Sequence, residues 1–282
     1  MRAVRALLPQ ADRILLVDNA SQGESQAILE DLNDPRVEIL RQPSNLGVGA
    51  AHNIGISTAR ERGASHVLLM DQDSVPQDDM VAKLLAAEQE LLTQGARVGA
   101  VGPAFYDPRL DKTWPFYRLS RFGVYGEPCA GNGLIACDFL ITSGMLVRLS
   151  VLDLVGGMNE GYFLEHVDTE WSLRARYHGY RLYGACSARM EHLLGDNVVR
   201  VPLTRRWVQL YEPERHYYLF RNSMLLWREP YAPPSWKRNE LRRLIQRIVF
   251  LSLFVPPRLR RVRMMLLGLW HGRLGRIGRL GT

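Results

Sequence analysis

The chain has 282 residues, of which 46% are hydrophobic and 23% are charged; this excludes an intrinsically disordered protein and allows one large α/β domain, alone or with an appendage. The charge is uneven, because residues 200–282 carry 18 basic and 4 acidic residues whereas residues 1–199 carry 18 basic and 25 acidic ones. A basic tail on an acidic body indicates an anionic partner, either a membrane surface or a nucleic acid.

The first hundred residues alternate between strand-like and helix-like segments. Helical spacing predicts helices at 3–10, 22–32, 50–62 and 78–94, and short apolar runs predict strands at 13–17, 37–40, 67–70 and from 98 to 102. The runs at 13–17 and 67–70 contain almost no polar residue, so we expect both strands to be buried. This alternation predicts a mainly parallel sheet flanked by helices.

The middle of the chain is less regular. Residues 105–133 are rich in Gly, Pro and aromatic residues, and we expect them to form no regular structure. Beyond them we expect strands at 137–142, 145–148 and 180–183 and one ending at 190–192, a short helix capped by Ser150, and a helix from Asp168 that ends at Gly179.

Two carboxylates, Asp71 and Asp73, follow the predicted strand at 67–70. Side chains two residues apart in an extended or turning backbone point the same way, and ligands of open α/β sheets bind beyond the carboxyl ends of strands. Two hard oxygen donors at that position suit Mg²⁺ or Mn²⁺ carrying a diphosphate. The alternative interpretation is a solvated acidic turn that caps the next helix.

The three cysteines are Cys129, Cys137 and Cys186, an odd number without CxxC spacing. This pattern argues against a disulfide framework and a structural zinc site, and it favours a reducing cytosol. The N-terminus lacks the apolar core of a signal peptide, and the sequence has no apolar run of about 18 residues that would predict a membrane-spanning helix.

An ordered set of motifs resembles family 2 GT-A glycosyltransferases, and most of all the rhamnosyltransferases of bacterial O-antigen and polysaccharide assembly. The similarity covers about residues 13–275, and each motif alone is weak. The motifs are Val17-Asp18-Asn19-Ala20-Ser21, Asn45-Leu46-Gly47, Asp71-Gln72-Asp73-Ser74, Asp138 to Gly144, Asp168 to Arg174, Met190 to Asp196 and Arg215 to Asn222.

The resemblance implies inverting transfer of a sugar, L-rhamnose from dTDP-L-rhamnose, to a glycan or polyprenol-linked acceptor hydroxyl. It places Asp71 and Asp73 at a Mg²⁺ or Mn²⁺ ion, and Asp168 as the general base. We expect the charges of Glu165 and Glu170 to raise the pKa of Asp168. The residues that it places at the nucleotide-sugar are Asp18, Asn19, Asn45, Asn53, Asp71 and Arg221.

Four further side chains in these motifs have two interpretations each. His192 is either a third metal ligand or a hydrogen-bonded core histidine. Arg221 either clamps a phosphate or forms a structural ion pair. Trp171 and Tyr217 are either platforms for the acceptor sugar or ordinary core aromatics.

Relatives of this kind begin with a strand that lines the nucleotide pocket, and here Met1 falls inside the first predicted helix. We expect that strand and its loop to be missing. From usual strand and loop lengths the missing piece has roughly 10–20 residues, and we favour a start site upstream. The neighbours of a missing central strand would be left with unpaired backbone groups. If the chain does begin at Met1, nucleotide binding is in doubt.

The tail from Trp236 interleaves Arg with Leu, Phe and Trp. Helical spacing predicts one helix up to Pro256-Pro257 and another from Arg258 to about Trp270. This composition is typical of an interfacial helix on anionic lipid, and a hairpin packed on the main domain or in a dimer interface is the alternative. The tail contains no recognisable RNA or DNA module, so we expect no nucleic-acid partner.

The sequence therefore predicts a GT-A domain at 1–230 and a basic, membrane-associating helical extension at 231–282. We expect a metal-dependent glycosyltransferase that is peripheral on the inner face of the cytoplasmic membrane. A homo-oligomer is compatible with the sequence. The alternatives are the same fold with galactofuranose, glucose or N-acetylglucosamine as donor sugar, and an inactive GT-A domain that binds glycans or acts as a scaffold.

Overall fold

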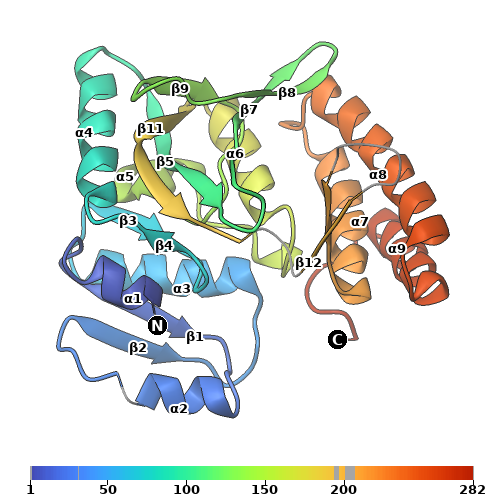
Figure 1. Ribbon diagram of the computed structural model, residues 1–282, viewed down its shortest axis with the longest axis horizontal. Coiled ribbons are helices and arrows are strands. Elements are labelled where there is room, and N and C mark those ends of the chain that lie inside the picture. Colours follow the sequence, from blue (N-terminus) through green and yellow to red (C-terminus); the bar gives the residue numbers. More distant parts are fainter. Residues whose placement is uncertain (1, 31, 194–196, 201–206, 282) are drawn as a thin grey trace.

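The computed structural model describes residues 2–30, 32–193, 197–200 and 207–281, and the side chains of this set outside 194–209. Figure 1 shows a central sheet with helices on its two faces, a small two-stranded sheet at one end and a group of helices at the other. The molecule is therefore of the α/β class, as predicted.

The N-terminal segment forms the small sheet. It contains α1 (Arg2–Leu7), β1 (Ile14–Asp18), α2 (Glu24–Glu30), β2 (Val37–Arg41) and α3 (Val48–Glu61). Strands β1 and β2 are parallel, in a register that runs from Ile14 opposite Val37 to Asp18 opposite Arg41. Among the described residues β1 pairs only with β2, and it forms no ladder with the central sheet.

The central sheet has the strand order β3-β10-β5-β11-β4. The strands of this path are β3 (His66–Leu69), β4 (Val75–Pro76), β5 (Val98–Asp107), β10 (Met145–Arg148) and β11 (Arg181–Glu191), and two further strands join the sheet beside it. Strands β5 and β11 are parallel, whereas β10 runs antiparallel to both β3 and β5. The central sheet is thus mixed, and the expectation of mainly parallel pairing was wrong in this detail. Helix α4 (Met80–Thr93) packs against β5 and β11.

The expectation that β1 and β3 are buried was also wrong. Only Asp18 of β1 and Leu69 of β3 are buried, and the other residues of both strands are partly exposed. The reason is that each strand pairs on one edge only within the described chain. An apolar strand needs neighbours on both edges and both faces to lose its solvent contact.

The segment that we expected to be irregular contains several strands. Strand β5 continues to Asp107, and β6 (Lys112–Thr113), the hairpin of β7 (Phe116–Ser120) and β8 (Gly123–Glu127), and β9 (Leu134–Cys137) follow. Strand β9 ends where we expected a strand to begin. The two strands expected at 180–183 and 190–192 are one strand, β11, with an irregular register between Ala185 and Arg189.

Three shorter elements lead to the candidate active site. They are α5 (Leu149–Val155), the 3₁₀ turn Glu160–Tyr162 and α6 (Val167–Tyr177). Helix α6 ends before Gly179, whose φ of 83° lies in the left-handed region that suits glycine. Its inner face carries Trp171, which has no exposed surface, and Leu173.

The C-terminal segment contains the short pair β12 (Asn197–Arg200) and β13 (Trp207–Leu210), then α7 (Pro213–Arg228), α8 (Pro234–Phe254) and α9 (Arg258–Arg273). The prediction of two tail helices separated by Pro256-Pro257 is confirmed. Helix α9 lies against α7 at Gly268 and Gly272, where an added Cβ would come within 2.5 Å of the Tyr217 carbonyl oxygen and 2.6 Å of the Arg221 carbonyl oxygen. One side of the tail is therefore packed on the protein, and among the described helices none is long and apolar enough to cross a membrane.

The cysteine expectation needs a correction, because Cys129 and Cys186 form a disulfide and Cys137 is free and buried. The antiparallel pairing of β9 with β11 creates this contact, and the backbone N–H of Cys186 donates to the carbonyl of Gly133 at 3.0 Å. Cysteine spacing contains no information on such a pairing between distant segments. The argument for a reducing cytosol consequently loses its support from the cysteines.

Candidate active site

The two aspartates and His192 meet at the carboxyl ends of their strands. Asp71 and Asp73 follow β3, and His192 follows β11, whose residue Glu191 lies opposite Val75 of β4. One potential ligand atom from each of the three side chains lies within 4.8 Å of the others. Two carboxylate oxygens and an imidazole nitrogen form a donor set that suits Mn²⁺ or Mg²⁺, so the residues fit a divalent metal.

A hydrogen-bonded chain of hydroxyls supports this cluster from behind. The buried Ser74 Oγ lies 2.6 Å from both Ser143 Oγ and His192 Nδ1. Ser143 Oγ in turn accepts from the backbone N–H of Asp71 at 3.2 Å. The chain fixes the Asp-x-Asp turn and the imidazole ring relative to each other, which is a common role of residues behind metal ligands.

The electrostatics distinguish the two aspartates. Burial, together with the charges of Asp73 and Asp168, raises the pKa of Asp71 to about 6. The hydrogen bond from His192, whose Nδ1 lies 3.5 Å from Asp73 Oδ1, lowers the pKa of the half-exposed Asp73. A carboxyl group that is costly to ionise beside a second one that is already ionised is a site that gains free energy when a cation binds.

Asp168 lies in the first turn of α6, close enough to Asp71 for its charge to contribute to the raised pKa of Asp71. Burial is the main cause that raises the pKa of Asp168, and the charge of Glu165 adds to it. Glu170 is not among the main causes of the shift, and its carboxylate is engaged elsewhere: it pairs with Arg174 at 2.8 Å and accepts from Tyr231 at 2.6 Å. Desolvation therefore dominates over the like-charge repulsion that we expected.

The loop before α6 holds an unusual backbone. Phe163, Glu165 and His166 all have φ near 60°, a region that non-glycine residues rarely occupy. The side-chain amide of Asn222 donates to the backbone carbonyls of Tyr162, Leu164 and Glu165, and so stabilises this conformation. Backbone strain of this kind is common at functional sites and persists only where surrounding contacts hold it.

Arg221 supports the same loop. It is fully buried, and its guanidinium donates to the backbone carbonyls of Gly161 and Tyr162 and to that of Gly278 near the C-terminus. Its ring neighbours are Tyr217 and Tyr218. The guanidinium of Arg221 is thus engaged with backbone carbonyls and has a structural role. The resemblance had instead implied that it binds a phosphate of the nucleotide-sugar.

Sequence reasoning missed Arg215 at the start of α7. Its guanidinium forms an ion pair with Glu165 at 2.7 Å and lies over the ring of Tyr211 at 4.2 Å. Its positive charge lowers the pKa of both Asp71 and Asp73. Among the described residues Arg215 is thus a cation of the helical segment that acts on Asp71 and Asp73, and only the folded chain brings it near them.

The candidate nucleotide residues are at the end of β1 and the start of α3. Asp18 is buried, and its Oδ1 accepts from the backbone N–H of Ser21 at 2.8 Å. The amide of Asn19 donates to Asn45 Oδ1 at 3.1 Å, which joins the two loops. Asn53 has a different environment. Its Nδ2 donates to the backbone carbonyl of Met158 and to Glu160, and its Oδ1 accepts from the backbone N–H of Met158, so its polar atoms are already engaged.

Trp171 and Tyr217 are core aromatics. Trp171 has no exposed surface and donates through Nε1 to the Gly156 carbonyl at 2.9 Å. Tyr217 is 2% exposed, and its hydroxyl lies 2.8 Å from His271 Nδ1. Neither ring is available to an acceptor sugar.

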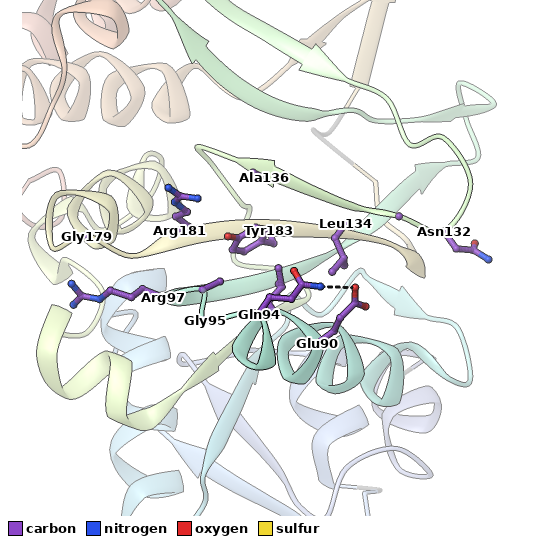
Figure 2. A pocket seen from close by; sticks show the side chains of 13 residues that line it. Glu90, Gln94, Gly95, Arg97, Asn132, Leu134, Ala136, Gly179, Arg181 and Tyr183 are labelled. Atoms are coloured by element: carbon purple, nitrogen blue, oxygen red, sulfur yellow. Dashed lines mark hydrogen bonds between the residues drawn. The ribbon is translucent and has the colours of Figure 1, made fainter.

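A cavity of about 860 Å³ lies elsewhere, between the end of α4, β9 and the first residues of β5 and β11 (Figure 2). Arg97, Arg181 and Tyr183 line it, and Gln94 donates to Glu90 at 3.2 Å on its wall. Arg181 begins β11 whereas His192 follows its end, so this cavity and the metal cluster are roughly 30 Å apart along the strand. The cavity contains none of the candidate residues.

The fold and this cluster define the class of the protein. Its structure is similar to that of GalNAc-T7 with UDP, GalNAc and Mn²⁺, with a TM-score of 0.55 and 13% identity over 90% of this chain and 55% of that chain. It is also similar to residues 1–349 of S. aureus TarS, with a TM-score of 0.50 and 14% identity over 98% and 87% of the two chains. These are likenesses of fold, and the fold is that of GT-A glycosyltransferases.

The sequence comparisons give the family. Residues 1–153 match glycosyl transferase family 2, so the chain belongs to this family and is a glycosyltransferase. It is 28% identical over 222 residues to the dTDP-rhamnosyl transferase RfbF of Shigella flexneri, which covers 78% of this chain and 72% of the relative. It is 31% identical over 168 residues to the polyprenol monophosphomannose synthase of Mycolicibacterium smegmatis, which covers 56% and 60% of the two chains.

Proposed function

We propose that this enzyme is an inverting rhamnosyltransferase that moves L-rhamnose from dTDP-L-rhamnose to a hydroxyl of a glycan or polyprenol-linked acceptor. The observation that carries the proposal is the shared electrostatic site of Asp71, Asp73 and Asp168. The choice of donor is supported by the similarity to a dTDP-rhamnosyl transferase over 78% of the chain.

In the proposed reaction Asp168 accepts the proton of the acceptor hydroxyl as its oxygen attacks the anomeric carbon. The bond from that carbon to the diphosphate oxygen breaks, and the diphosphate leaves with the electron pair. Burial that raises the pKa of Asp168 makes its ionised form a stronger base. Asn222 and Arg221 act as positioning residues, because they hold the loop that leads into Asp168.

The leaving diphosphate needs positive charge. Asp71, Asp73 and His192 would hold Mg²⁺ or Mn²⁺, which when bound neutralises the charge that develops on the diphosphate. Arg215 takes over the part that the resemblance gave to Arg221. Asp18, Asn19 and Asn45 remain our proposal for the nucleotide contacts, whereas Asn53 acts by holding the loop at Met158.

The tail is proposed to bind an anionic membrane surface on the cytoplasmic side. Residues 241–282 contain ten arginines and no acidic residue. Leu241, Ile245 and Val249 recur every four residues of α8 and are each about half exposed, and Leu259 and Trp270 of α9 are 88% and 57% exposed. Exposed apolar side chains among arginines are typical of an interfacial helix.

A second candidate function keeps the site and changes both substrates. The 31% identity to a polyprenol monophosphomannose synthase supports transfer of another hexose directly to a polyprenol phosphate. The third possibility, an inactive scaffold, predicts no turnover with any donor.

The test is to incubate the full chain with Mn²⁺ and a panel of nucleotide sugars and to follow nucleoside diphosphate release. We expect release from dTDP-L-rhamnose and its loss on chelation with EDTA. Release from GDP-mannose instead would favour the second candidate, and release from none of the donors would contradict both.

A further inference from the structure

The C-terminal extension, residues 231–282, touches the segment of Asp168 on both sides. The hydroxyl of Tyr231 donates to Glu170 at 2.6 Å, two residues after Asp168. Glu240 of α8 lies 3.4 Å from Nε2 of His166, two residues before Asp168. The extension is therefore joined both to the first turn of α6 and to the loop that leads into this helix.

His166 and Glu240 form a buried hydrogen-bonded network with Ser223 of α7. Ser223 Oγ donates to Glu240 Oε1 at 2.8 Å and lies 2.9 Å from Nε2 of His166. A hydroxyl has a single hydrogen, so Nε2 is the donor in the second contact. Glu240 is 1% exposed and Ser223 has no exposed surface, which shields these bonds from water. Removal of the carboxylate would leave the buried donors of two other residues without this acceptor.

The backbone of His166 explains why it needs this support. His166 directly precedes α6 and has φ 61° and ψ 6°, in the left-handed region that few non-glycine residues occupy. Its carbonyl accepts from the N–H of Glu170 at 2.8 Å, in the first turn of the helix. Within the described chain its imidazole does not cap α6, and its contacts are with Ser223 and Glu240 instead. Such a conformation persists only where the surrounding structure holds it.

The turn at His166 determines where the carboxyl group of Asp168 points, because Asp168 is the second residue of α6. Trp236 provides another contact from α8. It is 3% exposed, and its ring meets that of His166 edge to face, with the ring centroids 6.0 Å apart. Two residues of α8 thus hold the turn from which the proposed base projects.

We propose that Glu240 positions Asp168 through His166, so that α8 contributes to the active site in addition to the membrane attachment proposed above. Glu240 is a positioning residue, because it acts on the backbone turn before the base and not on the reacting atoms. This inference rests on the proposed function, since it takes Asp168 as the base. It adds that turnover depends on α8 even when no membrane is present.

The experiment compares turnover of the full chain, without vesicles, between wild type, Glu240→Gln and His166→Asn. The probe is dTDP-L-rhamnose with Mn²⁺ and with water as the acceptor, and nucleoside diphosphate release is followed. Asparagine suits the position of His166 because it tolerates φ near 60°, but its shorter side chain does not reach Glu240. We expect kcat to fall at least about tenfold in each variant, with the Kd of the donor and of Mn²⁺ within about twofold of wild type. The double variant should be no slower than the slower single variant, because both changes break one link.

The matched control is Glu88→Gln on α4. Glu88 is 3% exposed and contacts Nε2 of His66 at 2.7 Å, so this variant also removes a buried carboxylate from a histidine. His66 begins β3 whereas Asp71 follows the end of that strand, roughly 15 Å away. We expect Glu88→Gln to lower the midpoint of thermal unfolding and to leave kcat within about twofold of wild type.

A second comparison separates positioning from general destabilisation. In the Asp168→Asn background, Glu240→Gln should cause no further fall in the rate, because the base that it positions is already gone. A loss of stability that slowed the enzyme in another way would reduce the rate in both backgrounds. An undiminished effect of Glu240→Gln in the Asp168→Asn background would therefore overturn the proposal.

Hydrogen exchange provides a readout that needs no reaction. The amides of residues 163–170 should exchange faster in Glu240→Gln than in wild type, and at the wild-type rate in Glu88→Gln. Normal kcat in Glu240→Gln, an equal fall in Glu88→Gln, or unchanged exchange in this segment would each contradict a positioning role. A wild-type chain that releases nucleoside diphosphate from none of the donors counts against the proposed function alone, because the exchange measurement does not depend on turnover.

Discussion

The side-chain amide of Asn222 donates to the backbone carbonyl of Glu165 at 2.8 Å, three residues before Asp168. This contact joins α7 to the loop that leads into the proposed base, over a separation of 57 residues. The position of Asp168 therefore depends on a residue with no part in the chemistry.

Replacement of Asn222 by Ala should slow turnover without loss of metal binding. It leaves the carbonyls of Tyr162, Leu164 and Glu165 without this donor, which should cost about 1–3 kcal/mol of stability. We expect kcat to fall at least about tenfold, while the Kd for Mn²⁺ stays within about twofold of wild type. A variant with normal kcat would show that Asn222 does not position Asp168.

The raised pKa of Asp168 predicts a stability gain for Asp168→Asn. A carboxyl whose pKa is higher in the folded than in the unfolded chain binds protons more tightly when folded, so its ionisation destabilises the fold above the ordinary pKa of 3.8. Asparagine removes this penalty and can still accept from Thr169. The unfolding midpoint of Asp168→Asn should exceed that of wild type at pH 7.5, and the difference should shrink as the pH falls toward 4.

The same shift predicts the pH dependence of turnover. Because the base acts in its ionised form, kcat should fall with decreasing pH through a midpoint above the ordinary value for aspartate. The profile is measured at saturating donor and Mn²⁺, so that proton competition at the metal ligands does not contribute. A flat profile between pH 5 and 8 together with full activity of Asp168→Asn would exclude Asp168 as the base.

Metal binding should depend on all three proposed ligands. Asp73→Ala and His192→Ala should each weaken Mn²⁺ binding by roughly 10- to 100-fold, by analogy with other losses at metal sites. Glu191→Ala is the control, since Glu191 adjoins His192 but is exposed and outside the cluster. Unchanged Kd values in the first two variants would mean that the cation binds elsewhere.

Vesicle flotation tests the tail. The full chain should bind vesicles that contain anionic lipid more strongly than neutral ones, and added salt should weaken the binding. Replacing both Leu259 and Trp270 by Ser should reduce binding by about tenfold or more. Leu154→Ser on α5 removes another exposed leucine, at 67%, and should change nothing. Equal losses in both variants would contradict a specific membrane face.

The sequence was most informative where chemistry and local structure coincide. Asp71 and Asp73 follow an apolar run, so their place at a strand end could be predicted, and Pro256-Pro257 and Gly179 mark the ends of helices. The disulfide of Cys129, the contacts of Arg221 and the position of Arg215 could not be predicted, because each depends on segments about 50 to 60 residues apart. The hairpin β7–β8 was missed because its strands are short and only partly buried. The division at residue 230 and the oligomeric state remain predictions.

The most direct measurement is the single-turnover rate of sugar transfer from dTDP-L-rhamnose prebound with Mn²⁺, compared between wild type and Asp168→Asn. We expect the rate to fall by about 10²–10⁴-fold with the Kd of the donor unchanged, because only the proton acceptor is lost. An Asp168→Asn variant that transfers rhamnose at the wild-type rate would contradict a base that shares its site with the metal cluster.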